Sequence, residues 1–140
     1  MNEAAVADVL KFWFAELSEE QWFKVDPSVD EAIRSRFSGL YEAVAREIPA
    51  DASGVPSVAL ATVIVLDQFP RNMFRNDARA FSTDALARSV ATRAIAESRD
   101  RRTEQEMRAF MYLPFEHSED ITDQERSIAL FKSLSADSLK

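Results

Sequence analysis

The feature that most constrains this chain is an apolar run from Val58 to Phe69, which ends at Pro70 and leads into an arginine-rich turn. Its β-branched residues would suit a buried strand, but its length and the preceding Ser57, which can cap a helix, favour a buried helix. About ten apolar residues are too few to span a bilayer, which needs about 20. Proline lacks an N–H donor and its ring crowds the carbonyl four residues earlier, so we expect the helix to end or kink at Pro70.

The composition indicates helices throughout the chain. Only two glycines among 140 residues disfavour an all-β protein, whose turns need glycine, and suit helices joined by short connections. The length is that of one domain, so we expect a single all-helical domain over residues 1–140. The apolar spacing predicts five to six helices, over residues 3–17, 26–47, 58–69, 83–98, 103–114 and 122–134.

Local signals mark the helix boundaries. Asp26 followed by Pro27 is a strong start, because an acidic cap precedes a proline at the first helical position. Pro114 is expected to stop a helix, and residues 49–56, with two prolines and a glycine, form the clearest linker. Gly39 lies inside an apolar stripe, where the close approach of another helix would explain it. Three pairs have the spacing of a capping box: Ser18 with Gln21, Thr103 with Glu106, and Thr122 with Glu125.

Charge and cysteine content exclude some functions. With 17 basic and 24 acidic residues the net charge is −7, which argues against a general nucleic-acid or anionic-membrane binder. Residues 71–102 nevertheless carry eight arginines against four acids, an excess that solvated ion pairs on helix surfaces would explain. The lack of cysteine excludes disulfides and cysteine-based metal sites, which fits a reducing compartment such as the cytoplasm. Residues 1–20 lack the basic start of a secretory signal.

The first candidate site is the polar cluster around Pro70. Its members are Asp67, Gln68, Arg71, Asn72, Arg75 and Arg79. In a structural interpretation, Asp67 and Gln68 bond backbone groups at the broken helix end while Arg71 pairs with a buried carboxylate. In a binding interpretation, Arg71 and Arg75 hold a carboxylate or phosphate in a bidentate fork. The structural interpretation is the more general one, because every broken helix end leaves amides and carbonyls that need partners.

The second candidate site surrounds His117, the only histidine. Glu116 and Glu119 flank it, and a neighbouring carboxylate can fix the tautomer of an imidazole, which suits a general base. A turn whose acids cap the next helix explains the same residues more simply. The ligand spacing of carboxylate metal helices is missing, so neither a metal nor a cofactor is expected.

The two clusters have complementary charge, and each follows an apolar helix and a proline. If they meet across the core, Arg71 would pair with Glu116 or Glu119 beside His117. The walls of such a pocket are expected to be aromatic: Phe69, Phe74, Tyr112 and Phe115. The same pairing would suit a buried structural network, so it does not by itself indicate a function.

Two long motifs carry a resemblance to a known family. The first comprises Leu66–Arg75 and Ala78–Phe81, and the second comprises Tyr112–Asp120 and Gln124–Ser127. Together with the opening Val9–Phe14, they closely resemble the uncharacterised bacterial family DUF924 over nearly the whole chain. The resemblance implies an all-helical, tetratricopeptide-like superhelix, in agreement with the expected helices. It implies no activity, because none is assigned to that family.

Two departures from the family pattern bear on the candidate site. Relatives often have glycine where this chain has Asn76, and asparagine tolerates a left-handed backbone, so we expect the turn to survive. Relatives also continue through another helix into a basic, histidine-containing tail, whereas this sequence ends at Lys140. We therefore expect the chain to lack a C-terminal extension that would complete a pocket.

We expect an all-α fold, a compact array of antiparallel helix pairs with tetratricopeptide-like character. The leading functional hypothesis is a cytoplasmic binding domain for a peptide, a protein or a small anionic ligand. Its ligand-binding residues beside His117 would be Asp67, Gln68, Arg71, Asn72 and Arg75. The first alternative is an enzyme that uses His117 with Glu116 or Glu119 as general acid and base. The second is a scaffold or oligomerisation module, marked by an exposed apolar patch around Trp13 and Trp22.

Overall fold

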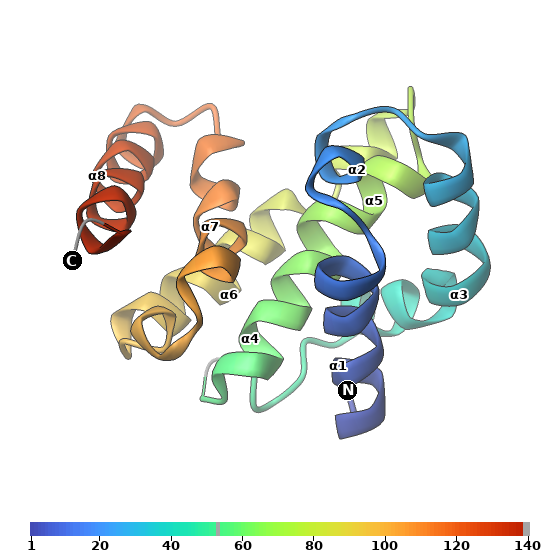
Figure 1. Cartoon of the computed structure of the whole chain (residues 1–140), viewed down its shortest axis with the longest axis horizontal. Coiled ribbons are helices and arrows are strands. Elements are labelled where there is room, and N and C mark those ends of the chain that lie inside the picture. The colour runs from blue at the N-terminus through green and yellow to red at the C-terminus, as the bar shows by residue number, and fades with distance from the viewer. Residues whose placement is uncertain (53, 139–140) are drawn as a thin grey trace.

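The periodic apolar residues form helices throughout the part of the chain that the structure describes, residues 1–52 and 54–138, and this part contains no strand. Figure 1 shows the arrangement, which is a computed structural model. The α-helices are α1 (Glu3–Lys11), α2 (Glu19–Phe23), α3 (Pro27–Arg46), α4 (Pro56–Val63), α5 (Phe69–Met73), α6 (Asp84–Ala96), α7 (Gln105–Glu116) and α8 (Ile121–Ser138). Two π-helical segments, η1 (Phe12–Glu16) and η2 (Ile64–Gln68), and two 3-10 turns, η3 (Ala78–Phe81) and η4 (Asp100–Arg102), lie between them. The all-α prediction is confirmed.

Two expectations fall partly on residues outside the described ranges. The predicted linker at 49–56 includes Ser53, and the expectation about the C-terminus concerns Leu139 and Lys140. The remaining linker residues join α3 to α4 through turns that are closed by bonds from Gly54 and Val55 N–H to the Asp51 carbonyl, at 3.1 and 3.0 Å.

The apolar run becomes a central helix that continues past Pro70. α4, η2 and α5 follow one another directly, and every residue from Val58 to Pro70 is buried. We expected the helix to end or kink at Pro70, and it does not end there. Pro70 lacks an N–H, and the Leu66 carbonyl four residues earlier instead accepts a bond of 2.6 Å from Thr83 Oγ1. The turn before Pro70 is π-helical, because the Phe69 N–H bonds to the carbonyl of Ile64, five residues earlier.

Pro114 lies inside a helix as well, although we expected it to stop one. α7 continues through it to Glu116, and the His117 N–H then bonds to the Leu113 carbonyl at 3.0 Å. Pro114 and Phe115 are both buried. Burial of these side chains offsets the single backbone bond that proline removes.

Helix starts agree with expectation where the bonds are local. Ser18 and Gln21 form the predicted capping box, with reciprocal bonds of 2.9 and 3.4 Å before α2. Asp26 caps α3 by accepting a bond of 3.0 Å from the Ser28 N–H, and Pro27 opens the helix. These bonds span two or three residues, so the sequence alone is enough to predict them.

Three other predicted caps are wrong. Val55 precedes α4 and Pro56 opens it, so Ser57 lies inside the helix. α7 begins after Glu104, without the capping box predicted for Thr103, and α8 begins at Ile121. The cap of α8 is Asp120, whose carboxylate accepts a bond of 2.8 Å from the Thr122 N–H. In each case a neighbouring residue takes the capping position, one or two residues from the predicted one.

Figure 1 shows helices packed against the central helix, with α8 lying outside α7. α3 lies against α5, α6 against α4, and α7 against both α4 and α6, while α7 and α8 form an antiparallel hairpin. Buried apolar side chains from α1, α3, the central helix, α6 and α7 form one core cluster, and partly buried side chains of α8 pack against it. Aromatic rings from three elements meet in it, with Phe37 centroids 5.3 Å from Phe12 and 4.9 Å from Phe69.

The N-terminal aromatic residues divide between core and surface. Trp13 is only 1% exposed, so it cannot contribute to the apolar surface patch expected of a scaffold. Trp22 is half-buried and stacks on Trp13 with a centroid distance of 6.4 Å. α2, which carries Trp22 and Phe23, contains no buried residue, and Phe23 is 73% exposed. This short helix is therefore held on the molecule mainly through the Trp22 ring.

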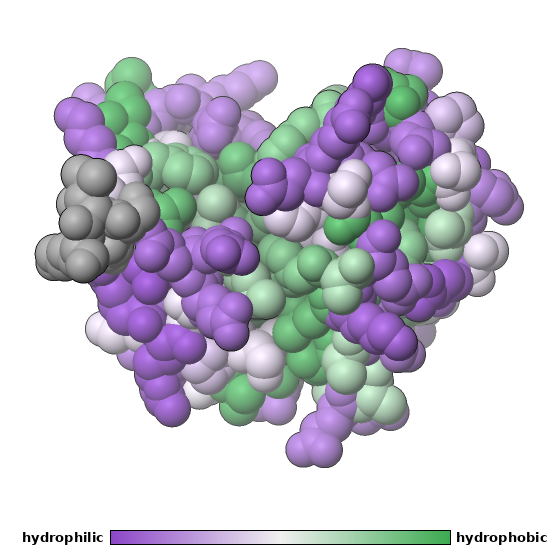
Figure 2. Space-filling model, viewed as in Figure 1, coloured by the Kyte–Doolittle hydropathy of each residue, from purple (hydrophilic) through white to green (hydrophobic). Residues whose placement is uncertain are grey.

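Gly39 corrects another expectation. A Cβ placed on Gly39 would meet nothing within 4 Å, so no helix approaches it closely. The surface around the helices is largely polar, with apolar side chains exposed in the middle of the face in Figure 2. The upper edge of that face is indented between the side formed by α7 and α8 and the side formed by α2 (Figures 1 and 2). No helix in the described ranges is long and apolar enough to cross a membrane.

Candidate functional site

Asp67 joins the two polar clusters of the sequence. It lies in η2, and its side chain has no exposed surface. Gln68 Nε2 donates to Asp67 Oδ2 at 2.7 Å, and His117 Nδ1 lies 2.9 Å from Asp67 Oδ1. The carboxylate beside His117 is therefore Asp67 and not Glu116 or Glu119. Both glutamates are exposed to water, whereas a buried carboxylate such as Asp67 needs protein partners.

Arg71 also contacts Asp67, but its main partner is an acid outside the predicted site. Its two Nη atoms form a fork on Asp84, with bonds of 2.8 and 2.9 Å to the two carboxylate oxygens. Nη1 additionally donates to the backbone carbonyl of Asp67 and lies 3.6 Å from Asp67 Oδ1. The expected pairing with Glu116 or Glu119 is wrong, because the packing of α6 on the central helix places Asp84 beside Arg71.

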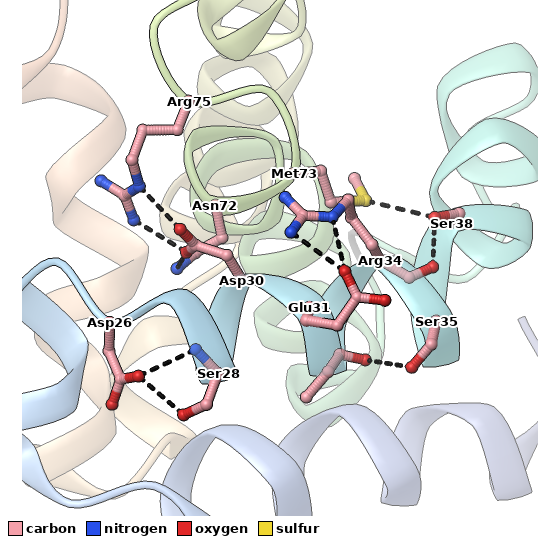
Figure 3. A network of polar contacts seen from close by, with 11 residues as sticks. Asp26, Ser28, Asp30, Glu31, Arg34, Ser35, Ser38, Asn72, Met73 and Arg75 are labelled. Atoms are coloured by element: carbon pink, nitrogen blue, oxygen red, sulfur yellow. Dashed lines mark hydrogen bonds and ion pairs between the residues drawn. The ribbon is translucent and has the colours of Figure 1, made fainter.

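Arg75 is held by a second buried acid, as Figure 3 shows. Asp30, on α3, accepts bonds of 2.8 Å from Nε and from one Nη of Arg75. Asn72 Nδ2 donates to the same carboxylate at 2.9 Å. These bonds tie α3 to α5 through side chains that are 45 residues apart for Arg75 and 42 apart for Asn72.

These contacts shift the pKa of both charged partners. Burial alone would raise the pKa of Asp30, but the bonds from Arg75 and Asn72 and the charge of Arg75 outweigh burial. The pKa of Asp30 therefore lies below its ordinary value of 3.8. The hydrogen bond with Asp30 raises the pKa of Arg75, against the opposing effect of burial.

The remaining members of the first cluster lie at its edge. Arg79 pairs with Glu42 on the surface and stacks over Phe74, with its guanidinium carbon 4.1 Å from the ring centroid. Arg79 therefore stands apart from Asp67 and His117. Asn76 has a φ of 67°, the left-handed conformation that the turn was predicted to need, so that prediction is confirmed.

A pocket of about 310 Å³ opens beside Arg71 and Arg75, and we name it the central pocket. α2 forms one wall and the end of α7 the opposite wall, with α5 between them, which corresponds to the indentation in Figure 2. Its lining residues are Trp22, Phe23, Lys24, Gln68, Arg71, Asn72, Arg75, Leu113, Glu116 and His117. Apart from Asp67, which lies behind His117, all the predicted ligand-binding residues reach this pocket.

The aromatic walls of the pocket differ from the predicted ones. Phe69, Tyr112 and Phe115 are fully buried in the core, and Phe74 packs against Tyr41. The Tyr112 hydroxyl donates to Asp100 at 2.6 Å, and burial together with this bond raises its pKa. These rings are close to the polar residues in the sequence, but in the structure they face the core or other helices and not the pocket. The rings that line the pocket come from α2.

Two wider hollows adjoin Arg71 on its other side. One, of about 670 Å³, lies between α6 and the residues after α7, and includes Arg88, His117 and Glu119. The other, of about 540 Å³, lies over the turn at residues 75–81. Phe81, which is 58% exposed, borders both hollows, and the Arg71 guanidinium carbon lies 5.3 Å from its ring centroid. His117 thus lines one hollow and the central pocket.

Sequence reasoning missed Asp30, Asp84 and the α2 side chains. Asp30 stands three residues before Ile33 and seven before Phe37, in the apolar stripe of α3. A charge in such a stripe was a signal that a buried partner must exist. Asp84 lies in the first turn of α6, where an acid is expected anyway, so nothing in the sequence distinguished it. Within the described ranges, no group of three or more acidic or histidine side chains is arranged to hold a metal ion.

Comparison with known proteins agrees with this architecture and leaves the chemistry open. The chain is similar to a solved structure described as a protein of unknown function, ATU0120 from Agrobacterium tumefaciens. The two share 37% sequence identity and a TM-score of 0.89, over 94% of this chain and 74% of the other. No curated protein matches the chain. Residues 9–140 match the family described as bacterial proteins of unknown function, DUF924, and this protein therefore belongs to the DUF924 family.

Proposed function

We propose that this protein is a helical binding domain that holds a small ligand through a single carboxylate in the central pocket. The observation that carries the proposal is the fixed position of two arginines on the pocket lining. Asp84 holds Arg71 and Asp30 holds Arg75, each through two bonds of 2.8–2.9 Å. A guanidinium that is already fixed loses little side-chain entropy when a ligand arrives.

Each arginine keeps N–H groups for a ligand. A guanidinium has five N–H donors. Arg71 uses three of them, two on Asp84 and one on the Asp67 carbonyl. Arg75 uses two, both on Asp30. The remaining donors, two on Arg71 and three on Arg75, form no hydrogen bond within the described part of the chain, and both side chains are partly exposed, at 23% and 32%.

The charge balance of the site favours a ligand with a single carboxylate group over a polyanion. Asp84 and Asp30 largely compensate the two arginines, and Lys24 at the rim is exposed and pairs with Glu20 at 2.9 Å. A polyphosphate needs several uncompensated cations, which this site does not offer. A carboxylate needs only charge-assisted hydrogen bonds in a planar fork, which guanidinium groups supply.

The remaining lining of the pocket is suited to an apolar group. Trp22, Phe23 and Leu113 form an apolar wall beside the arginines, and Trp22 is anchored by a bond of 2.7 Å from its Nε1 to the Trp13 carbonyl. Aromatic side chains bind apolar groups at low entropic cost because they have few rotatable bonds. A ligand with a carboxylate at one end and an apolar body at the other fits both parts of the lining.

The proposal is tested with 3-phenylpropionate and its neutral analogue 3-phenylpropionamide, by NMR titration of the protein. We expect the acid to bind at least about tenfold more tightly than the amide, because charge-assisted bonds to arginine are lost in the amide. Arg75→Lys should weaken binding of the acid by about tenfold, because lysine retains the charge and lacks the fork. The matched control Arg79→Lys, outside the pocket, should leave binding unchanged. Equal binding of acid and amide, or binding of neither, would refute the proposal.

One observation favours a second function, an enzyme with His117 as general base. The contact of 2.9 Å between Asp67 Oδ1 and His117 Nδ1 is an arrangement that orients an imidazole for proton transfer. In this hypothesis Asp67 takes the role first assigned to Glu116 or Glu119. The test is hydrolysis of p-nitrophenyl acetate. We expect the wild-type rate to exceed that of His117→Gln by about 100-fold, and equal rates would rule this function out.

We further infer a tetratricopeptide-like stacking of helix pairs, a single domain over residues 1–140 and a cytoplasmic location. The antiparallel hairpin of α7 and α8 supports the first inference, and the single core cluster supports the second. The absence of cysteine supports the third. Superposition of successive helix pairs and immunolocalisation of the native protein would test them.

A further inference from the structure

The wall of the central pocket opposite α2 carries acceptors that no arginine uses. Glu116 ends α7 and lines the pocket, and its side chain is exposed. Its carboxylate forms no hydrogen bond or ion pair with any residue in the described ranges, in contrast to Asp30, Asp67 and Asp84. The Glu116 backbone is nevertheless held in place, because Gln124 Nε2 donates to its carbonyl at 2.7 Å.

His117 supplies the second acceptor. Its Nδ1 faces Asp67 Oδ1 at 2.9 Å, so in the neutral ring the hydrogen resides on Nδ1 and Nε2 is an acceptor. Nε2 forms no hydrogen bond within the described residues, and it is not among their buried atoms without a partner. Nε2 is therefore open to solvent on a ring that lines the pocket.

We propose that the ligand is a free α-amino acid with an apolar side chain. This inference rests on the proposed function and adds to it the chemistry at the α-carbon. The carboxylate binds the free donors of Arg71 and Arg75, the ammonium group donates to Glu116 and to His117 Nε2, and the side chain lies against Trp22 and Phe23. Donors for the carboxylate and acceptors for the ammonium group thus line the same pocket.

The charges around the pocket favour a zwitterion over a simple anion. With His117 neutral, the cations are Lys24, Arg71 and Arg75, and the acids are Glu20 beside Lys24, Asp30, Asp67, Asp84 and Glu116. The acids outnumber the cations, so a simple carboxylate adds to an uncompensated negative charge. A zwitterion adds none and gives the unpaired Glu116 a partner.

The size of the pocket also suits this ligand class. A volume of about 310 Å³ is at the lower end of the range for small-molecule sites, which begins at about 300 Å³. An amino acid carries both of its charged groups on one atom, the α-carbon. A peptide does not, because its carboxylate and its ammonium group belong to opposite ends of the chain.

The inference is tested with four probes that share a benzyl group. These are L-phenylalanine, 3-phenylpropionate, phenethylamine and N-acetyl-L-phenylalanine. We expect L-phenylalanine to bind at least about tenfold more tightly than each of the others, because only it offers both charged groups. Binding of 3-phenylpropionate or N-acetyl-L-phenylalanine at least as tight as that of L-phenylalanine would overturn the amino-acid assignment.

Two neighbouring glutamates provide a matched pair of variants. Glu116→Gln removes the charge of Glu116 from the central pocket. We expect it to weaken binding of L-phenylalanine by about tenfold without weakening binding of 3-phenylpropionate, which has no ammonium group. Glu119 is equally exposed and lines the other hollow, so Glu119→Gln should change neither affinity. An equal loss of L-phenylalanine affinity in both variants, or no loss in Glu116→Gln, would contradict the role of Glu116.

The same probes separate failure of this inference from failure of the proposed function. If 3-phenylpropionate binds and Arg75→Lys weakens it, while L-phenylalanine binds no better, the carboxylate site stands and the amino-acid assignment falls. If phenethylamine binds as tightly as L-phenylalanine, or no probe binds, the arginines hold no carboxylate. The amino-acid assignment and the proposed function are then both rejected.

Discussion

Two buried carboxylates, Asp30 and Asp67, organise the polar residues beside the central pocket, and they do so differently. Asp30 forms a closed cluster with Asn72 and Arg75, which we name the Asp30 cluster. Asp67 belongs to an open one, the Asp67 cluster, which includes Gln68, Arg71, His117 and, through Arg71, Asp84. The Asp30 cluster joins two helices, α3 and α5, while the Asp67 cluster joins the central helix to α6 and to the end of α7.

The difference shows which part of the site serves the fold and which part can serve a ligand. Both oxygens of Asp30 accept bonds from Asn72 or Arg75, so the Asp30 cluster resembles a structural link, although Arg75 retains unused donors. In the Asp67 cluster the buried carboxylate positions His117 and Arg71. Both side chains line the central pocket and also the hollow between α6 and the residues after α7. Burial is complete for Asp67 and nearly complete for Asp30, so both clusters should matter for stability.

The largest effect is expected for Asp67→Ala. The substitution leaves the buried Gln68 amide and the His117 Nδ1 without a partner and opens a gap in a fully buried position. We expect the free energy of unfolding to fall by at least about 3 kcal/mol, measured by urea denaturation. The His117 imidazole NMR signals should also move. A loss of unfolding free energy smaller than that of Asp30→Ala would mean that the Asp30 cluster, and not the Asp67 cluster, contributes more to stability.

A smaller loss is expected for Asp30→Ala, about 2 kcal/mol in the free energy of unfolding. The side chain of Arg75 is 32% exposed, so water can solvate part of the guanidinium once its partner is gone. Urea denaturation measures the loss, and the His117 signals serve as a control. They should stay in place, because Asp30 and Asn72 do not contact His117 in the described structure. Movement of those signals would show that the two clusters are one network.

The pH dependence of stability should report on the Asp30 cluster. The folded-state pKa of Asp30 is lowered, so its contribution is complete above the ordinary value of 3.8 and is lost as the pH falls through the lowered value. We expect the difference in free energy of unfolding between wild type and Asp30→Asn to be constant above about pH 5 and to shrink in acid. A difference that grows as the pH falls below 3.8 would mean that burial, and not Arg75, controls this carboxylate.

The smallest effect is expected for Arg79→Ala, which tests an arginine outside both clusters. Its pair with Glu42 is half-exposed on each side, at 50% and 49%, and such surface pairs contribute little. We expect a loss of about 0.5 kcal/mol in the free energy of unfolding, from the ion pair and the stacking on Phe74 together. A loss comparable to that of Asp30→Ala would mean that exposure does not distinguish the arginines of this turn.

Much of the site could be found from the sequence because polar residues next to a buried apolar run must be satisfied somewhere. That reasoning selected Asp67, Gln68, Arg71, Asn72, Arg75 and His117, which the structure brings together. It failed for their partners. The acid on Arg75 comes from 45 residues away and the acid on His117 from 50, and no local rule relates such positions. It also failed at Pro70 and Pro114, where burial of the helix outweighs the tendency of proline to end it.

The sequence by itself determined the helical class, the capping box at Ser18 and the start of α3, because each depends on interactions within a few residues. The left-handed turn at Asn76 followed from the resemblance to a family that often has glycine there. Only the tertiary structure decided which carboxylate faces which cation. Asp30, Asp84, Glu116 and Glu119 are similar acids in the sequence. Packing buries Asp30 and most of Asp84 beside arginines and leaves the glutamates in water, since a carboxylate can be desolvated only where a cation or donor is brought to it.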